Sequence, residues 1–478
     1  MISFNNHNSF KGVHYDGHTI KEIHSAMGKV WPEESPTPPT PTGYSSQYLT
    51  FVAEEDGTFK FNGNSISYSI DSGATWTTLA SDTDSPTVES GNTIMWKANI
   101  LAQTHAGDTY IGTFSSSGKF SVEGNIMSLL YNDNFIGQTD LTARNEVFSY
   151  LFDECTNLTN AENLILPATS LSSYCYMDMF KDCTNLVTVP QLLATILVQG
   201  CYSSMFYNCS GLTSVPSNML STTRLAVNCY EGMFQGCTSL TTAPSLPATE
   251  LKAGCYISMF KGCTSLTTAP SLPATTLAIW CYYDMFNGCT SLTTAPSLPA
   301  TTLSEKCYNS MFYNCSGLTT VQQLPATTLA ESCYNNMFCG CKSLETVPSD
   351  MLLATTLADS CYTSMFNSCT SLTTAPELLA TTLAEKCYSN MFYRCTNLTT
   401  APSLPATTLA SYCYNSMFQY CTRLKYIKCL ATDISAQYCT NNWVSHVASS
   451  GTFVKAASMT SWTSGNNGIP NNWTIQDA

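Results

Sequence analysis

One block of residues recurs down most of this chain of 478 residues. The segment Cys281-Tyr-Tyr-Asp-Met-Phe-Asn-Gly-Cys289 and the Thr-, Ala- and Pro-rich stretch after it have near-copies on both sides. The copies lie 26 residues apart, with three steps of 28 residues. One phenylalanine marks each copy: Phe152, Phe180, Phe206, Phe234, Phe260, Phe286, Phe312, Phe338, Phe366, Phe392 and Phe418. This fixed period predicts a stack of one small unit, whose function lies on an extended surface rather than in one deep pocket.

The charge and the lengths of the apolar runs exclude two classes of partner. Charged residues are 11% of the chain and the formal net charge is −14. Nothing forms the basic stripe that nucleic-acid binding requires, and no apolar run approaches the ~18 residues of a membrane span. We therefore expect no nucleic-acid partner and no membrane insertion. The start, from Met1 to Asn8, lacks the basic and apolar regions of a secretory signal, which predicts assembly in the cytoplasm.

The 24 cysteines all lie between Cys155 and Cys439, inside the repeats. A full copy has a Cys-Tyr pair and a second cysteine eight residues later, as in Cys255 and Cys263. Zinc sites use closer cysteine pairs, so no metal is expected. If the segment is helical, eight residues span about 12 Å, which is too far for a disulfide within one copy. The spacing favours small buried hydrophobic side chains, and a bridged framework remains the alternative.

The composition changes along the chain and predicts five parts. Residues 1–31 form an N-terminal anchoring module, and residues 32–43 form a Pro-rich linker with five prolines in twelve residues. Residues 44–140 alternate apolar and polar positions between Gly-containing turns, which predicts a β-sandwich. Residues 141–445 are the repeats with their terminal caps, and residues 446–478 form a C-terminal cap. Within the predicted sandwich, Ser69 to Trp76 resembles the Asp box of sialidase propellers; because it occurs once, it predicts only a turn held by Asp71.

Each repeat combines an extended half and a half with a four-residue period. In Leu266 to Pro270 the Leu and Ala point one way and the threonines the other, which predicts a short strand in a parallel ladder. Cys281, Met285 and Cys289 follow at i, i+4 and i+8, which predicts a helical turn with one apolar stripe. The expected fold class is mixed α/β, with a leucine-rich-repeat-like solenoid of about eleven repeats of 26–28 residues behind an all-β sandwich and a small N-terminal module.

This pattern resembles the Bacteroidales-associated BspA-type leucine-rich repeat, in which an aromatic-x-x-Cys-x-x-Leu core is followed by a Leu/Thr strand. The resemblance covers residues 140–445. The chain departs from common leucine-rich repeats because it lacks an Asn ladder and a strict Leu-x-x-Leu-x-Leu strand. Proteins of this family are mostly bacterial surface proteins that bind host matrix, glycans or other cells, so the resemblance implies a binding role without naming a ligand.

The candidate ligand-binding residues are those that change from copy to copy. The strand and loop hardly vary, whereas the positions around Cys-Tyr and after Met-Phe vary freely and include aromatic and basic residues, a composition typical of recognition surfaces. The candidates are Tyr174, Tyr207, Trp280, Tyr283, Tyr313, Tyr393, Arg394, Tyr412 and Tyr420. Two alternatives remain: drift at solvated positions, and a binding surface on the threonine rows of the strands. No catalytic set, phosphate loop or cofactor motif is found, so the chain is not expected to be an enzyme.

The order of the parts suggests a function. The opening unit, with Asp16 to Ile23 and Gly28 to Trp31, is similar to short N-terminal modules of phage tail and receptor-binding proteins. The hypothesis is a phage tail or capsid-associated protein that recognises a bacterial surface glycan or protein and joins other virion proteins through residues 1–31. The alternative is a bacterial cell-surface adhesin. A third class, a glycan hydrolase, lacks paired catalytic carboxylates. A homo-oligomer is a further possibility, although the sequence contains no coiled-coil heptads that would support one.

Overall fold

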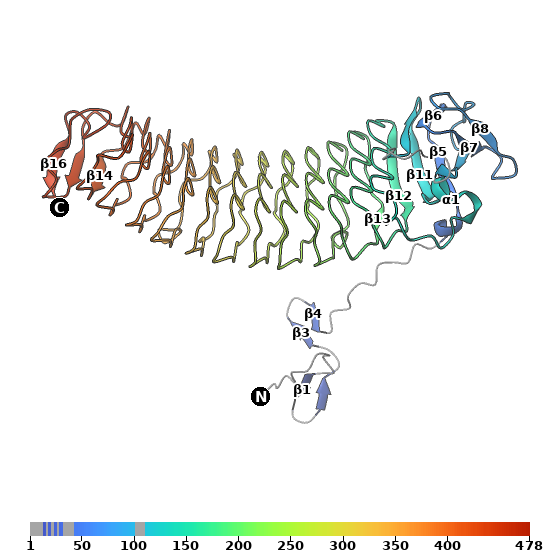
Figure 1. Ribbon diagram of the computed structural model, residues 1–478, viewed down its shortest axis with the longest axis horizontal. Helices are drawn as coiled ribbons and strands as arrows, with labels where there is room; N and C mark the ends of the chain where they lie inside the picture. Colours follow the sequence, from blue (N-terminus) through green and yellow to red (C-terminus); the bar gives the residue numbers. More distant parts are fainter. Residues whose placement is uncertain (1–12, 16–17, 21–22, 26–27, 32–42, 101–109) are drawn as a thin grey trace.

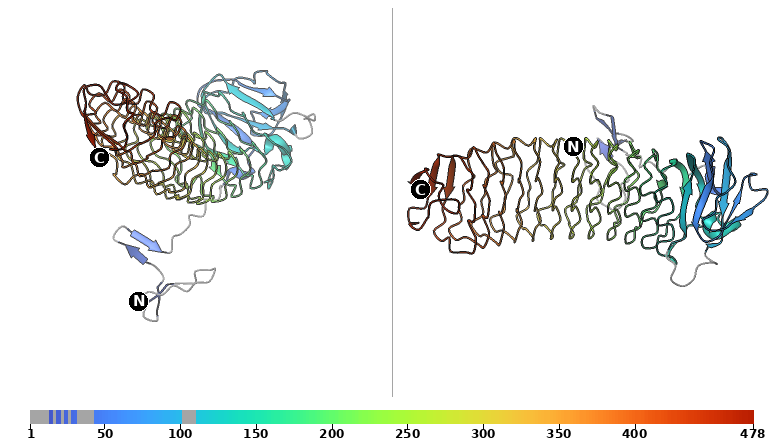
Figure 2. Two further views of the ribbon diagram at one scale, coloured as in Figure 1. Left: turned by 60° about the vertical axis from the view of Figure 1, so that its left-hand side comes forward. Right: turned by 90° about the horizontal axis from the view of Figure 1, so that it is seen from above.

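The computed structural model describes residues 43–100 and 110–478, and four short strands before them (Figure 1). These strands form two antiparallel hairpins, β1 (Val13–Tyr15) with β2 (His18–Ile20) and β3 (Ile23–Ser25) with β4 (Gly28–Trp31). The predicted linker, up to residue 42, lies outside the described residues, as does most of the predicted anchoring module. The repeats form one long, gently curved rod between an N-terminal β region and a small C-terminal sheet (Figures 1 and 2).

The N-terminal β region is built from strands whose alternate residues are buried. Its strands are β5 (Leu49–Ala53), β6 (Phe59–Gly63), β7 (Ile66–Ser69), β8 (Thr77–Leu79), β9 (Thr93–Lys97), β10 (Gly112–Ser116) and β11 (Phe120–Asn125). Short helices η1 (Tyr44–Ser46), α1 (Ser128–Tyr131) and η3 (Asn132–Asn134) flank them. One seven-stranded sheet has the order β13-β12-β11-β5-β9-β7-β8, and β10 pairs with β6 separately. The predicted sandwich is not confirmed, because this sheet continues into the repeats through β12 (Leu158–Leu166) and β13 (Gln191–Leu192).

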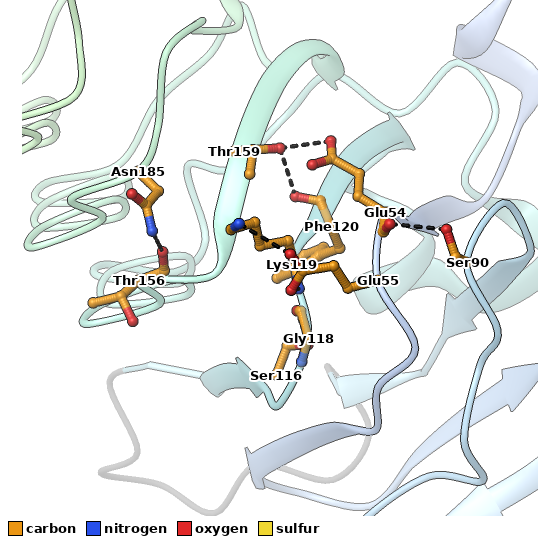
Figure 3. Close-up of polar contacts among 10 residues, drawn as sticks. All are labelled: Glu54, Glu55, Ser90, Ser116, Gly118, Lys119, Phe120, Thr156, Thr159 and Asn185. Atoms are coloured by element: carbon orange, nitrogen blue, oxygen red, sulfur yellow. Dashed lines mark hydrogen bonds and ion pairs between the residues drawn. The ribbon is translucent and has the colours of Figure 1, made fainter.

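Polar contacts join the β region to the first repeats (Figure 3). The Thr159 hydroxyl lies 2.7 Å from a carboxylate oxygen of Glu54 and 3.0 Å from the carbonyl oxygen of Phe120. Next to these contacts, and within the β region itself, the Lys119 ammonium pairs with Glu55 at 2.9 Å. The Phe114 ring lies 5.8 Å from Phe152, the first marker phenylalanine of the repeats. The β region therefore covers the N-terminal end of the repeat core.

The Cys-to-Cys segment of each repeat is a run of tight turns, and the predicted helical turn is wrong. No residue between 141 and 445, all of which are described, is helical. In one copy the N–H of Met259 donates to the carbonyl of Tyr256, three residues back, at 3.3 Å, and the N–H of Tyr256 donates to Cys281 of the next repeat at 3.1 Å. Such bonds alternate along the segment, so each repeat satisfies its backbone partly by pairing with its neighbour. The described chain is rich in repeats and strands and has almost no helix, so the mixed α/β class is not confirmed.

Every fourth residue of these turns has a positive φ, which explains the misleading period. In one copy, Gly254, Ser258 and Gly262 have φ values of 62°, 52° and 75°. The segment therefore repeats a four-residue unit, two side chains inward and two outward, and it shares its i, i+4 apolar spacing with a helix. Left-handed backbone favours Gly and, less strongly, Asn and Asp, and these residues together with Ser occupy most of these positions here.

Aromatic rings stack in two columns inside the rod. The marker phenylalanines lie face to face, as in Phe286 against Phe312 at 5.5 Å and 5°. The tyrosines of the Cys-Tyr pairs form the second column, as in Tyr282 against Tyr308 at 5.6 Å and 4°. Stacked pairs contribute about 0.5–1.5 kcal/mol each beyond their buried area. Because each ring within a column stacks on the rings before and after it, each repeat is stabilised mainly by its two neighbours.

All 24 cysteines are free and buried, as the spacing predicted, and no disulfide framework is present. The second cysteine of each copy also donates its thiol to the marker phenylalanine of the preceding repeat; Cys289 reaches the carbonyl of Phe260 at 3.1 Å. The same bond recurs at 3.0–3.2 Å from Cys183 to Cys421. These thiols are therefore both core side chains and hydrogen-bond donors between repeats.

We expect Cys289→Ala to destabilise the protein more than Cys281→Ala. Both side chains are fully buried. Only Cys289 donates its thiol to a carbonyl among the contacts of the described residues, so its variant also loses a weak hydrogen bond worth about 0.5 kcal/mol. Guanidinium unfolding of the two variants measures the difference. Equal losses would mean that the thiol–carbonyl contact contributes nothing beyond packing.

The extended half of each repeat forms a sparse parallel ladder. The strand predicted around Leu266 to Pro270 appears as single bridges, such as Thr242 to Thr268 and Thr294 to Thr320. At the C-terminal end the ladder becomes a regular parallel sheet of β14 (Tyr426–Cys429), β15 (Thr452–Lys455) and β16 (Thr474–Asp477). Trp443 closes the core there: it is fully buried and stacks on Tyr414 at 6.1 Å.

Candidate ligand-binding face

The outward side chains of the turn segments form one long face, which we call the turn face. Three columns of left-handed residues run along it. The first is the residue before each Cys-Tyr, or before the equivalent pair in the terminal copies: Glu146, Tyr174, Gly200, Asn228, Gly254, Trp280, Lys306, Ser332, Ser360, Lys386, Tyr412 and Tyr438. The third is the residue before each second cysteine, or before Val447 in the last copy: Glu154, Asp182, Asn208, Gly236, Gly262, Gly288, Asn314, Gly340, Ser368, Arg394, Tyr420 and His446. Side chains 26 or 28 residues apart thus become neighbours.

The second left-handed column carries small residues from Asp178 to Asn442, all of them polar except Gly232. Asp178 has φ of 53° and is partly covered by the neighbouring turns. Burial raises the pKa of Asp178 to about 6, and the positive charge of Lys181 opposes this rise. Lys181 itself pairs with Asp153 at 3.1 Å and with Asp182 at 3.2 Å.

We expect Asp178 to make the first repeats less stable as the pH rises. Its pKa is raised in the folded protein, so its contribution is fully present below the unfolded value of about 4 and is lost as pH rises through about 6. Partial solvent exposure limits the effect to about 1 kcal/mol. Unfolding of the parent and of Asp178→Asn between about pH 4 and about pH 7 measures it. If the free energy of unfolding changes by the same amount in the parent and in Asp178→Asn across this pH range, the expectation is contradicted.

Three of the sequence-predicted residues gather near the C-terminal end of the turn face. The guanidinium carbon of Arg394 lies 5.3 Å from the centre of the Tyr393 ring and 5.5 Å from that of Tyr420. The two tyrosine rings meet edge to face at 5.6 Å. His446 stacks on Tyr420 at 4.5 Å and 18°. We call Tyr393, Arg394, Tyr420 and His446 the C-terminal cluster.

The other predicted residues occupy separate places on the turn face. Trp280 is 41% exposed, and the Lys306 ammonium lies 5.9 Å from its ring. Tyr283 is half-buried in the same repeat as Trp280. The predicted residue Tyr412 contacts the ring of Tyr438 at 5.1 Å and the ammonium of Lys386 at 5.3 Å.

Three predicted tyrosines stand apart from these groups. The Tyr174 hydroxyl accepts a hydrogen bond from Gln199 at 2.7 Å, and its ring lies where a Cβ of Gly200 would be, so that position requires glycine. Tyr207 and Tyr313 show no ring contact among the described residues. The nine candidates therefore share one face but do not form one site.

The sequence reading missed His446 and Tyr438, although a signal for both was available. Each lies 26 residues after a predicted candidate, Tyr420 and Tyr412 respectively. The repeat period therefore places them in the same columns, even though the surrounding residues no longer match the repeat. Counting the period through the last copy would have found them.

The alternative surface, the threonine rows, is partly used by the fold itself. The Thr319 hydroxyl donates to the carbonyl of Thr293 in the preceding repeat at 3.2 Å, and Thr241 does the same to Thr213 at 3.1 Å. These hydroxyls connect neighbouring repeats, so a structural role accounts for the recurrence of threonine in these rows.

In the part of the chain that the structure describes, no group of three or more His, Cys, Asp or Glu could hold a metal ion. No helix among those residues is long and apolar enough to cross a bilayer.

Comparisons with known proteins agree with the architecture. The model of the BspA type leucine rich repeat region matches six copies, over residues 145–293, 255–375 and 360–453. No curated protein matches the chain. Among solved structures, the crystal structure of a TLR13–ssRNA13 complex is 13% identical over 67% of this chain and 50% of that chain, with a TM-score of 0.20, a likeness too low to carry an argument. Since the family match extends over more than half of its length, the chain belongs to the BspA-type leucine-rich repeat family.

Proposed function

We propose that this chain is a non-enzymatic surface-recognition protein that binds a bacterial surface glycan or protein through its turn face. The observation that carries the proposal is the set of aromatic and basic side chains held at left-handed positions, with Trp280 and the C-terminal cluster the most developed. Bulky residues are disfavoured at positive φ, and such conformations gather at functional sites. BspA-like repeats point in the same direction, to a surface adhesin or repeat protein.

The finer proposal is a virion protein, tail- or capsid-associated, that is assembled in the host cytoplasm. Its support is the order of the sequence, in which residues 1–31 precede a Pro-rich stretch at residues 32–43 and then the repeats. A stiff spacer of this kind suits a part that attaches to other virion proteins and a part that works at a distance. The second candidate is a bacterial cell-surface adhesin, which the repeat family favours. Immunogold labelling of phage particles and of uninfected cells separates the two.

A cell-binding assay tests the recognition role itself. Fluorescently labelled full-length protein is incubated with a panel of bacterial strains, beside a triple variant, Trp280→Ser, Arg394→Ser and Tyr420→Asn. Serine and asparagine already occupy these columns in other copies, so the variant keeps the fold. The matched control is Asn314→Ser in the third column. We expect saturable binding by the parent and the control, and loss of binding by the triple variant. Equal binding by the triple variant would exclude Trp280 and the C-terminal cluster as the binding residues, and with them the observation that carries the proposal.

A further inference from the structure

The third left-handed column changes character in its last three members. From Glu154 to Ser368 every member is acidic or small, whereas the next three are Arg394, Tyr420 and His446, with φ values of 59°, 63° and 63°. Bulky side chains disfavour this backbone region, and the same column shows that the fold accepts Gly, Asn or Ser there. Histidine is among the residues that this region tolerates, whereas Arg394 and Tyr420 replace the Gly, Asn or Ser found elsewhere in the column, so the change to basic and aromatic side chains marks this end of the column as a candidate site.

The backbone fixes the spacing of these three residues. The N–H of Arg394 donates to the carbonyl of Gln419 at 2.9 Å, and the N–H of Tyr420 donates to the carbonyl of Ser445 at 2.9 Å. The Ser445 hydroxyl lies 2.8 Å from Nδ1 of His446, which orients the imidazole against the Tyr420 ring. The cluster is therefore preorganised: the Tyr420 and His446 rings stack on each other, and the guanidinium lies beside both tyrosine rings, which also contact each other.

Arg394 differs from the lysines on the turn face in that its positive charge has no carboxylate partner among the described residues. Lys181, Lys261, Lys306 and Lys386 each pair with a carboxylate at 2.6–3.2 Å. No ion pair to Arg394 occurs within the described residues. Its own turn and the two that follow, residues 390–396, 416–422 and 442–448, contain no Asp or Glu. In a chain of net charge −14, the guanidinium is thus left without an anion of its own.

We infer that the C-terminal cluster binds an acidic saccharide, with the sugar carboxylate on Arg394 and the sugar ring on the Tyr420–His446 platform. A guanidinium presents paired N–H donors that match a planar carboxylate, and an aromatic face packs against the C–H face of a sugar. The inference rests on the proposed recognition function and names its ligand class. Because the cluster has one cation and a ring platform, a carboxylate carried on a sugar ring fits it better than a free anion.

Calorimetric titration of the full-length protein tests the inference with three probes: an oligogalacturonate, its methyl-esterified neutral form, and inorganic phosphate. We expect the oligogalacturonate alone to bind. Arg394→Ser and Tyr420→Asn should each weaken its binding by about tenfold or more, and Asn314→Ser should leave it unchanged. Arg394→Ser should melt at about the same temperature as the parent, because serine already occupies this column at Ser368 with φ of 61°.

Equal affinity for the esterified form or for phosphate, or unchanged binding by Arg394→Ser, would overturn the inference. Tyr420→Asn gives a second reading if Arg394→Ser melts lower than expected. The cell-binding assay separates a failure of the proposed ligand class from a failure of the proposed recognition function. If Arg394→Ser still binds cells and the parent does not bind oligogalacturonate, the ligand class is wrong and the recognition function stands. If the parent binds neither cells nor oligogalacturonate, both fail.

Discussion

Phe286→Ala should destabilise the protein by about 3–5 kcal/mol, because it removes a fully buried ring from the middle of a continuous stack. The ring lies 5.6 Å from Phe260 and 5.5 Å from Phe312, so both neighbours lose a stacking partner at once. The cavity cannot close without moving two repeats that are bonded to each other through their backbones. Guanidinium unfolding measures the loss.

The matched control for this prediction is Tyr283→Ala in the same repeat. Tyr283 is half-buried on the turn face, and its removal should cost less than about 1 kcal/mol. Hydrogen exchange adds a spatial test, because a stack with nearest-neighbour coupling should open around the lost ring rather than along the whole rod. Similar losses from both variants would mean that the ring columns do not carry the stability of the repeats.

Trp443→Ala should cost about 3–5 kcal/mol and loosen the C-terminal end selectively. The Trp443 side chain is fully buried, stacks on Trp462 at 5.6 Å, and donates its indole N–H to the carbonyl of Gly468 at 2.9 Å. The variant therefore leaves a cavity and an unpaired carbonyl in the same place. Because His446 follows three residues later, the C-terminal cluster should lose its geometry as well.

Hydrogen exchange of the Trp443→Ala protein measures where the loosening occurs. We expect faster exchange over residues 414–478 and unchanged exchange around Phe180, far along the rod. Trp280→Ala is the control, since Trp280 is 41% exposed and its loss should leave exchange unchanged throughout. Uniform acceleration along the array would contradict the account, because it would require the repeats to unfold as a single unit.

The repeat period was enough to predict the stack and its interior, but not the local backbone. The inward positions of Cys281, Met285 and Phe286 follow from their recurrence, and all three are fully buried. The helical turn was wrong because tight turns with a left-handed residue every fourth position have the same apolar spacing as a helix. The discriminating signal is in the outward residues: Asn228, Gly232 and Gly236 fall four residues apart, where left-handed backbone favours them.

The candidate site was predicted in part for the same reason. Tyr393, Arg394 and Tyr420 were found because they vary between copies, and they meet because residues 26 apart become neighbours. The grouping itself was not predictable, since it depends on which outward columns lie side by side. The continuation of the N-terminal sheet into β12 was also missed, because parallel pairing between segments distant in sequence leaves no periodic signal.

Thiol titration of the native and the unfolded protein tests the central claim, that the copies form one rod with the cysteines inside. Burial raises the pKa of Cys315 to about 12, and it acts in the same direction on the other core thiols. The account predicts that a thiol reagent finds almost no reactive cysteine in the native chain and all 24 in guanidinium. Rapid reaction of many thiols in the native protein, or fewer than 24 after unfolding, would contradict it.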